Sequence, residues 1–169
     1  MSGITFNCKK CGTCCRNLIE DANGIKTGLL LTVKEIDLFP SEMVSPKFAI
    51  GFEMPDKIIQ YQLNVNDCPH VNEKNECQIY EKRPLMCRAF PYESGTVSVK
   101  CPVIGSRIKV YEPCEVEVSA TEIDASEKMN RHILNRFQKF YKKGQKAWIF
   151  DLETRKWVMT TRDNFHQTL

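Results

Sequence analysis

The sequence predicts a small α+β protein, with an irregular cysteine-rich domain at residues 1–118 and a helix plus β-hairpin extension at residues 119–169. Three observations predict it. The chain has 169 residues, a length typical of one domain with an appended element. All nine cysteines lie at or before residue 114. Beyond residue 118 the apolar residues follow first a helical and then an alternating period.

Short elements are expected in the first region. Residues 8–20 are predicted to form a metal-binding knuckle that runs into a short turn or helix. A capping box at Thr32–Glu35, followed by apolar residues up to Pro40, predicts a short helix. Apolar and polar residues alternate over 59–65, which predicts a half-buried strand that leads to Cys68.

The next segments are also short. Residues 72–76 are polar and predict a turn. Residues 77–89 predict a helical turn, a break near Pro84 and a second short helix. Residues 92–99, around Ser94-Gly95, predict a hairpin.

The extension contains the clearest periodic pattern. A second capping box at Ser119–Glu122 opens a run of apolar residues at helical spacing, and Gly144 ends it. Alternating apolar residues over 148–159 then predict a final hairpin.

The use of cysteine favours metal binding over disulfides. The sequence shows no secretory signal and no apolar run long enough for a membrane span, so a cytoplasmic location is expected, where thiols stay reduced. An odd number of cysteines also fits disulfide pairing poorly. The net charge of +3 gives no nucleic-acid signal by itself.

The first cysteine motif is Cys8-x2-Cys11-x2-Cys14-Cys15. Iron–sulfur sites of the ferredoxin type use C-x2-C-x2-C with a remote Cys-Pro, which Cys68-Pro69 and Cys101-Pro102 both offer. Zinc also accepts paired cysteines. Two adjacent cysteines do not easily ligate one tetrahedral ion, so Cys14 and Cys15 are expected to serve different iron atoms or different sites.

The second motif surrounds Cys77 and Cys87. Four thiolates around a metal centre carry net negative charge, and Arg83 and Arg88 are predicted to neutralise it and to donate hydrogen bonds to sulfur. Pro84 precedes Cys87 and fixes the local backbone. His70 is interpreted as a polar loop residue rather than a ligand. No catalytic residue is predicted.

With these motifs the chain resembles the YkgJ-type CxxCxxCC proteins, described as zinc- or iron-chelating. The resemblance covers roughly residues 8–102 and rests on the number, order and spacing of the motifs. It implies that eight cysteines are metal ligands, whereas Cys114 is an additional cysteine outside the pattern. The implied ligands are Cys8, Cys11, Cys14, Cys15, Cys68, Cys77, Cys87 and Cys101.

Three hypotheses about function follow. The first is an iron–sulfur protein with a [4Fe-4S] cluster and a protein redox or enzyme partner. The favoured cluster ligands are Cys8, Cys11, Cys14 and one Cys-Pro cysteine. The remaining cysteines are then free to hold a second metal. The second is a structural zinc protein that binds a macromolecule. The third, from analogy with the larger flagellin lysine-N-methylases, is a metal-dependent enzyme that modifies protein. No nucleic-acid or membrane partner is expected.

Overall fold

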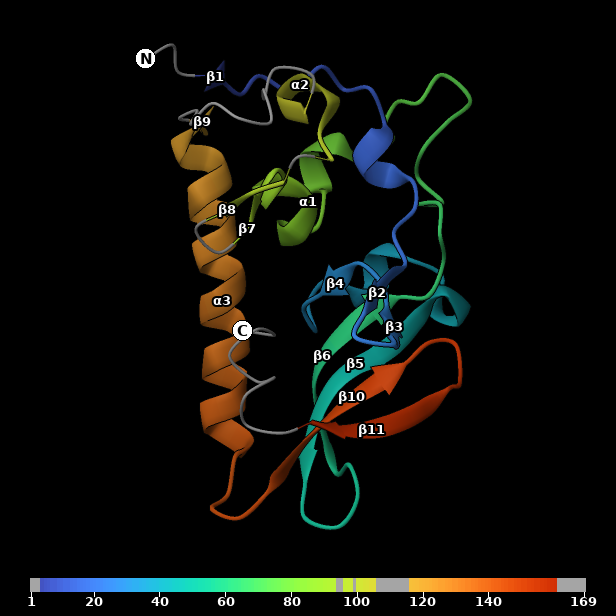
Figure 1. Cartoon of the computed structure of the whole chain (residues 1–169), viewed down its shortest axis with the longest axis vertical. Coiled ribbons are helices and arrows are strands. Elements are labelled where there is room, and N and C mark those ends of the chain that lie inside the picture. The colour runs from blue at the N-terminus through green and yellow to red at the C-terminus, as the bar shows by residue number, and fades with distance from the viewer. Residues whose placement is uncertain (1–3, 94–95, 99, 106–115, 161–169) are drawn as a thin grey trace. The chain divides into compact units, whose positions relative to one another are not determined.

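The computed structural model describes residues 4–93, 96–98, 100–105 and 116–160 (Figure 1). The chain divides into two compact units. Unit 1 consists of Met1–Asn17 and Asp67–Lys128, and unit 2 of Leu18–Asn66 and Met129–Leu169. The fold contains helices and antiparallel sheets with a C-terminal helix and hairpin, so the predicted α+β class is confirmed. The domain boundary at 118/119, which rests on cysteine distribution, stays a prediction.

Unit 2 is built on a five-stranded antiparallel sheet with the order β11-β10-β5-β6-β4. The strands are β4 (Leu30–Leu31), β5 (Val44–Gly51), β6 (Lys57–Leu63), β10 (Lys146–Asp151) and β11 (Lys156–Thr160). The predicted final hairpin is thus confirmed as β10 and β11. A separate two-stranded ribbon pairs β2 (Glu20–Ala22) with β3 (Ile25–Thr27).

Strand β6 is buried on both faces. The prediction of a half-buried strand is therefore wrong for its polar face, since Gln60 is 1% and Gln62 0% exposed. Gln62 is accommodated because its amide bonds to three backbone groups: Nε2 donates to Pro46 O at 2.8 Å and to Phe150 O at 3.2 Å, and Oε1 accepts from Gly28 N at 2.8 Å. A buried polar side chain is tolerated when such partners are present.

The short helix predicted after the first capping box is a 3₁₀ turn at Ile36–Leu38, with another 3₁₀ turn at Ser41–Met43. The capping box itself is present, because the Glu35 carboxylate accepts hydrogen bonds from Thr32 N at 2.8 Å and Thr32 Oγ1 at 2.9 Å. Pro40 follows and ends the helical turn.

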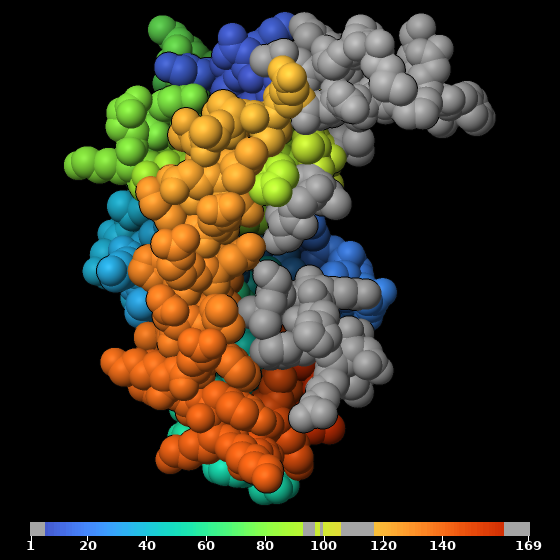
Figure 2. Space-filling view, turned by 90° about the vertical axis from the view of Figure 1, so that its left-hand side faces the viewer, coloured from blue at the N-terminus to red at the C-terminus, as the bar shows by residue number. Residues whose placement is uncertain are grey.

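Helix α3 (Ala120–Phe140) begins in unit 1 and ends in unit 2. Ser119 caps it as predicted: Glu122 accepts from Ser119 N at 2.9 Å, and Thr121 N donates to Ser119 Oγ at 3.2 Å. In unit 2 its apolar side packs on the sheet, where the rings of Phe137 and Phe48 stack at 6.5 Å. Figure 2 shows the helix, in orange, at the surface of the molecule, and its exposed residues are mostly polar or charged.

Besides the first part of α3, the elements of unit 1 that fall in its described residues are short. These are β1 (Ile4–Thr5) paired in parallel with β9 (Val116–Glu117), the hairpin β7 (Tyr92–Glu93) and β8 (Thr96–Val97), and helices α1 (Leu85–Ala89) and α2 (Pro102–Gly105). The 3₁₀ turns are Thr13–Cys15 and Tyr80–Lys82. The predictions of a hairpin at 92–99 and of two short helical segments at 77–89 are confirmed, within the described residues.

A small apolar cluster forms the core of unit 1. Phe6, Cys101, Val103 and Ile104 are buried together, and Phe90 packs against them. No helix in the described part of the chain combines the length and apolar character that a membrane crossing requires.

Candidate metal centre

The first cysteine motif forms a loop that ends in a 3₁₀ turn. Cys15 N donates to Gly12 O at 2.9 Å, and Arg16 N donates to Thr13 O at 3.2 Å. This turn leaves Cys8 and Cys11 exposed and carries Cys14 and Cys15 partly into the unit. None of these four cysteines, and no other described cysteine, forms a disulfide.

Gly12 fits the loop closely against a second segment. Its φ of +73° lies in the left-handed region, and a Cβ at this position would stand 2.5 Å from the backbone oxygen of Asn75. A side chain is therefore excluded on two grounds, strain and contact. The polar turn predicted at 72–76 is confirmed, and it packs directly on the cysteine loop.

Backbone and charge contacts bring Cys68 to the loop. Cys68 N donates to Cys15 O at 2.9 Å. Arg16 holds the flanking residues on both sides, with an ion pair to Asp67 at 3.3 Å and a hydrogen bond to Asn75 Oδ1 at 3.1 Å. Residues more than fifty positions apart in the sequence are thus fixed next to each other.

Cys14, Cys15 and Cys68 are neighbours through their thiols. A hydrogen bond with Cys15 lowers the pKa of Cys14 and that of Cys68. The same two hydrogen bonds, together with burial, raise the pKa of Cys15. Cys15 therefore lies within hydrogen-bond reach of both Cys14 and Cys68.

Cys77 and Cys87 lie next to these three cysteines. We call Cys14, Cys15, Cys68, Cys77 and Cys87 together the five-thiol group. Burial raises the pKa of both thiols, and repulsion from Cys14 and Cys68 adds to the effect. Cys87 lies on helix α1, which starts directly after the fully buried Pro84. The proline therefore sets the direction from which Cys87 faces the group.

Arg83 is the cation of the five-thiol group. Its charge contributes to lowering the pKa of Cys14, after the hydrogen bond with Cys15, and partly offsets the effect of burial on Cys77 and Cys87. The guanidinium lies 3.5 Å from the centroid of the Tyr80 ring, and its Nε donates to Tyr80 O at 2.7 Å. Arg88 is exposed and donates from Nε to Arg83 O at 2.7 Å, so it acts on the backbone of Arg83.

The other three described cysteines, Cys8, Cys11 and Cys101, form what we call the three-thiol group. Burial raises the pKa of Cys101, with smaller contributions from the repulsion of Cys11 and Cys8. A hydrogen bond with Thr13, whose Oγ1 lies 3.3 Å from Cys11 Sγ, lowers the pKa of Cys11, while repulsion from Cys14 acts in the opposite direction. The three-thiol group and the five-thiol group therefore adjoin at Cys11 and Cys14. Cys101 is 5% exposed and also belongs to the apolar core of unit 1.

The donor chemistry fits a thiophilic metal centre. Thiolates suit zinc and iron–sulfur clusters, and Arg83 supplies compensating charge. His70 lies close to Cys68 and lowers the pKa of its thiol through its backbone and its charge, but less than Cys15 does. Among the described residues, no three His, Cys, Asp or Glu side chains already stand at the spacing of a single ion's ligand shell.

Sequence reasoning had assigned no role to three residues at this site. Gly12 allows the cysteine loop to pack closely against Asn75. Arg16 binds Asp67 and Asn75, and the ring of Tyr80 contacts the guanidinium of Arg83. Their place inside the cysteine motifs was the only signal that marked them. Cys114 lies outside the described residues.

One of the three comparisons with known proteins finds a match, and that match covers the cysteine region. Residues 7–103, more than half of the chain, match the family model CxxCxxCC, described as "Putative zinc- or iron-chelating domain". No curated protein and no solved structure matches the chain.

Proposed function

Because the chain belongs to the CxxCxxCC family of zinc- or iron-chelating domains, we propose that unit 1 binds a [4Fe-4S] cluster through its motif cysteines. The proposed role is electron transfer, or a cluster that serves a partner enzyme. When bound, the cluster would supply one-electron chemistry, and the protein would supply its ligands and their electrostatic surroundings.

The observation that carries this proposal is the five-thiol group around Arg83. A structural zinc ion takes four ligands, whereas Cys14, Cys15, Cys68, Cys77 and Cys87 offer five thiols in one neighbourhood. The adjacent Cys14 and Cys15 both take part, and a cluster offers several iron atoms to neighbouring residues. Cys68 is the Cys-Pro cysteine that belongs to this group, whereas Cys101 belongs to the three-thiol group.

The surroundings support the same proposal. Bound thiolates and a cluster carry negative charge, which Arg83 offsets from its position over Tyr80. Lys10 adds a second cation, since its Nζ lies 4.4 Å from the centroid of the same ring. The three-thiol group remains as the proposed place of a second metal or of the remaining cluster ligands.

The test is the metal and sulfide content of the full chain purified without oxygen. We expect brown protein with a broad band near ~400 nm and about four iron and four acid-labile sulfide per chain. Colourless protein with about one or two zinc ions and no sulfide would replace the cluster with a structural zinc site.

Matched cysteine variants assign the ligands. Cys14→Ser and Cys68→Ser should each remove most of the iron and sulfide, because each deletes a thiol from the five-thiol group. Cys114→Ala is the control, since this cysteine lies outside the motif. Loss of the cluster in Cys114→Ala, with full retention in Cys14→Ser and Cys68→Ser, would refute the assignment.

A further inference from the structure

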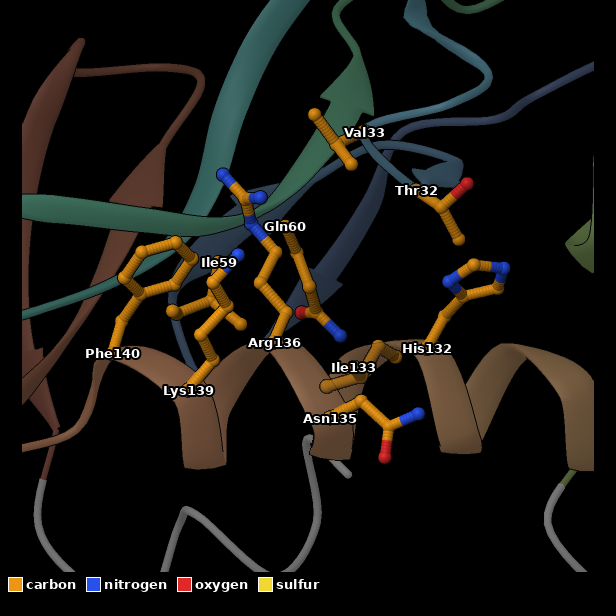
Figure 3. Close-up of a pocket in the computed structure, with 10 residues that line it drawn as sticks. All are labelled: Thr32, Val33, Ile59, Gln60, His132, Ile133, Asn135, Arg136, Lys139 and Phe140. Carbon is orange, nitrogen blue, oxygen red and sulfur yellow. The ribbon is translucent and has the colours of Figure 1, made fainter.

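Unit 2 contains a pocket of about 210 Å³ between strand β6 and the second part of helix α3 (Figure 3). The sheet side contributes Ile59 and Gln60 from β6, with Thr32 and Val33 from the preceding loop. The helix contributes the other six lining residues: His132, Ile133, Asn135, Arg136, Lys139 and Phe140. The pocket lies wholly within unit 2, away from the cysteine motifs in the sequence.

An unsatisfied hydrogen-bond donor lines this pocket. Gln60 is 1% exposed, and its Nε2 has no hydrogen-bond partner among the described residues. Figure 3 shows its side chain extending from the strand toward helix α3. Gln62, two residues further along the strand, has partners for both ends of its amide. Leaving a buried donor unpaired is unfavourable, so its presence at a pocket wall favours an acceptor supplied from outside.

The charge of the wall is positive. Arg136 and Lys139 are among the ten lining residues, and no Asp or Glu is. Arg136 donates to Ile58 O from Nε at 3.1 Å and from Nη2 at 3.0 Å, which fixes its guanidinium against the strand without neutralising it. The described residues contain no carboxylate paired with Arg136 or Lys139.

A third cation lies beside the pocket. Lys57 Nζ stands 4.3 Å from the centroid of the Phe140 ring, the ring that also has Arg136 and Lys139 at 5.3 Å each. Glu35, which Thr32 contacts, accepts two hydrogen bonds from that residue and is not part of the wall. Three cations thus face one nearby carboxylate, and the net local field favours an anion.

The rest of the wall is apolar, with Val33, Ile59 and Ile133 beside the ring of Phe140. The pocket volume equals that of about seven water molecules. A short carboxylic acid fits in the same volume. A site with a few polar groups on an otherwise apolar wall is typical of a small-molecule pocket.

We propose that this pocket binds a small organic monocarboxylate, whose acid group accepts a hydrogen bond from Gln60 Nε2 in the field of Arg136 and Lys139 while its apolar body lies against Ile59 and Ile133. The site is independent of the cysteine motifs, so its test leaves the proposed metal centre unaffected.

The test is a titration of the full-length, metal-loaded chain with hexanoate, followed by calorimetry and by the side-chain amide resonances of Gln60. We expect saturable binding with a Kd of about 1 mM, in keeping with a ligand of this size, and a shift of the Gln60 amide signals on saturation. Hexanamide, the neutral isostere, should bind at least about tenfold more weakly, because it lacks the charge.

Variants locate the site. Arg136→Gln and Gln60→Leu should each weaken hexanoate binding about tenfold. Lys139→Gln changes an exposed residue that the fold does not depend on, and it should weaken binding several-fold. Lys143→Gln, an equal charge change on an exposed residue just beyond the same helix, is the matched control.

Three results would overturn the proposal: hexanoate that does not shift the Gln60 amide signals, hexanamide that binds as tightly as hexanoate, or Lys143→Gln that weakens binding as much as Lys139→Gln.

Discussion

Unit 2 buries large apolar side chains against a five-stranded sheet, whereas the described part of unit 1 has a small apolar cluster and strands of two residues. In unit 2, Phe48, Ile50 and Leu63 are no more than 2% exposed. The apolar cluster of unit 1 gathers around Phe6, Val103 and Ile104 and includes a cysteine. All nine cysteines of the chain fall within the residue ranges of this unit and none within those of unit 2. The difference leads us to expect that packing stabilises unit 2, while unit 1 depends on the additional free energy of metal ligation.

Removal of the metal should produce the largest difference in stability between the two units. Structural metal binding contributes about 10 kcal/mol or more to folding, so a chelator under reducing conditions should increase amide exchange in unit 1 about 100-fold or more. The amides of Cys15 and Cys68, which hold the loop together, are the sites to follow by hydrogen exchange and mass spectrometry. If the amides of β5 and β6 lost as much protection from exchange, the two units would unfold as one cooperative unit. The proposed difference in their stabilisation would then be wrong.

Phe48→Ala tests the packing of unit 2. Phe48 is 2% exposed and stacks on Phe137, so its truncation should lower the free energy of unfolding by about 3–5 kcal/mol without changing the metal content. Denaturant titration with parallel metal analysis measures both. Phe52→Ala is the control, since Phe52 is 49% exposed and should cost less than about 0.5 kcal/mol. A similar loss in both variants would contradict the assignment of Phe48 to the core.

Gln62→Leu tests whether the buried hydrogen bonds of Gln62 also stabilise unit 2. The change removes the partners of Gly28 N, Pro46 O and Phe150 O, and should lower the free energy of unfolding by about 2–4 kcal/mol. Gln60→Leu is its matched partner on the same strand and should be neutral or stabilising, because it deletes an unpaired donor. Equal destabilisation by the two variants would show that Gln60 has a protein partner after all.

Asp151 predicts a pH dependence that belongs to unit 2 alone. Hydrogen bonds, chiefly from Thr154 Oγ1 and also from the backbone N–H groups of Lys26, Glu153 and Thr154, lower the pKa of Asp151 from 3.8 to about 2. Because the folded pKa lies below the unfolded one, its stabilisation is present above pH 3.8 and is lost as the pH falls through about 2. Asp151→Asn should cost about 1–2 kcal/mol at pH 7 and progressively less in acid. A cost that stays constant down to pH 2 would contradict this origin.

Ser119→Ala gives the smallest expected effect and concerns the helix that both units share. Loss of the N-cap should lower the free energy of unfolding by about 1 kcal/mol, with faster exchange confined to the first turns of α3. Ser119→Asp keeps a capping oxygen and should retain most of the stability. An unchanged helix start in Ser119→Ala would mean that tertiary contacts alone position α3.

The elements that were predicted correctly depend on local signals. The capping box at Ser119 and the apolar spacing after it define α3, and the alternation over 148–159 defines the final hairpin. Strand β5 has no such signal, because Pro46 interrupts it and its residues do not alternate. Its pairing with β10, about a hundred residues away, is a long-range contact that periodicity does not report. The same holds for the buried polar face of β6, since only the layers around a strand decide which of its faces is covered.

The sequence by itself determined the donor chemistry of the candidate centre. The cysteine motifs give the type and spacing of the donors, and thiolates bind thiophilic metals. The tertiary structure alone decided their grouping: Cys14, Cys15 and Cys68 with Cys77, Cys87 and Arg83, and Cys8 and Cys11 with Cys101. The physical reason is that grouping depends on contacts between distant segments. The hydrogen bond from Cys68 N to Cys15 O and the close approach of Gly12 to Asn75 fix the motifs against each other.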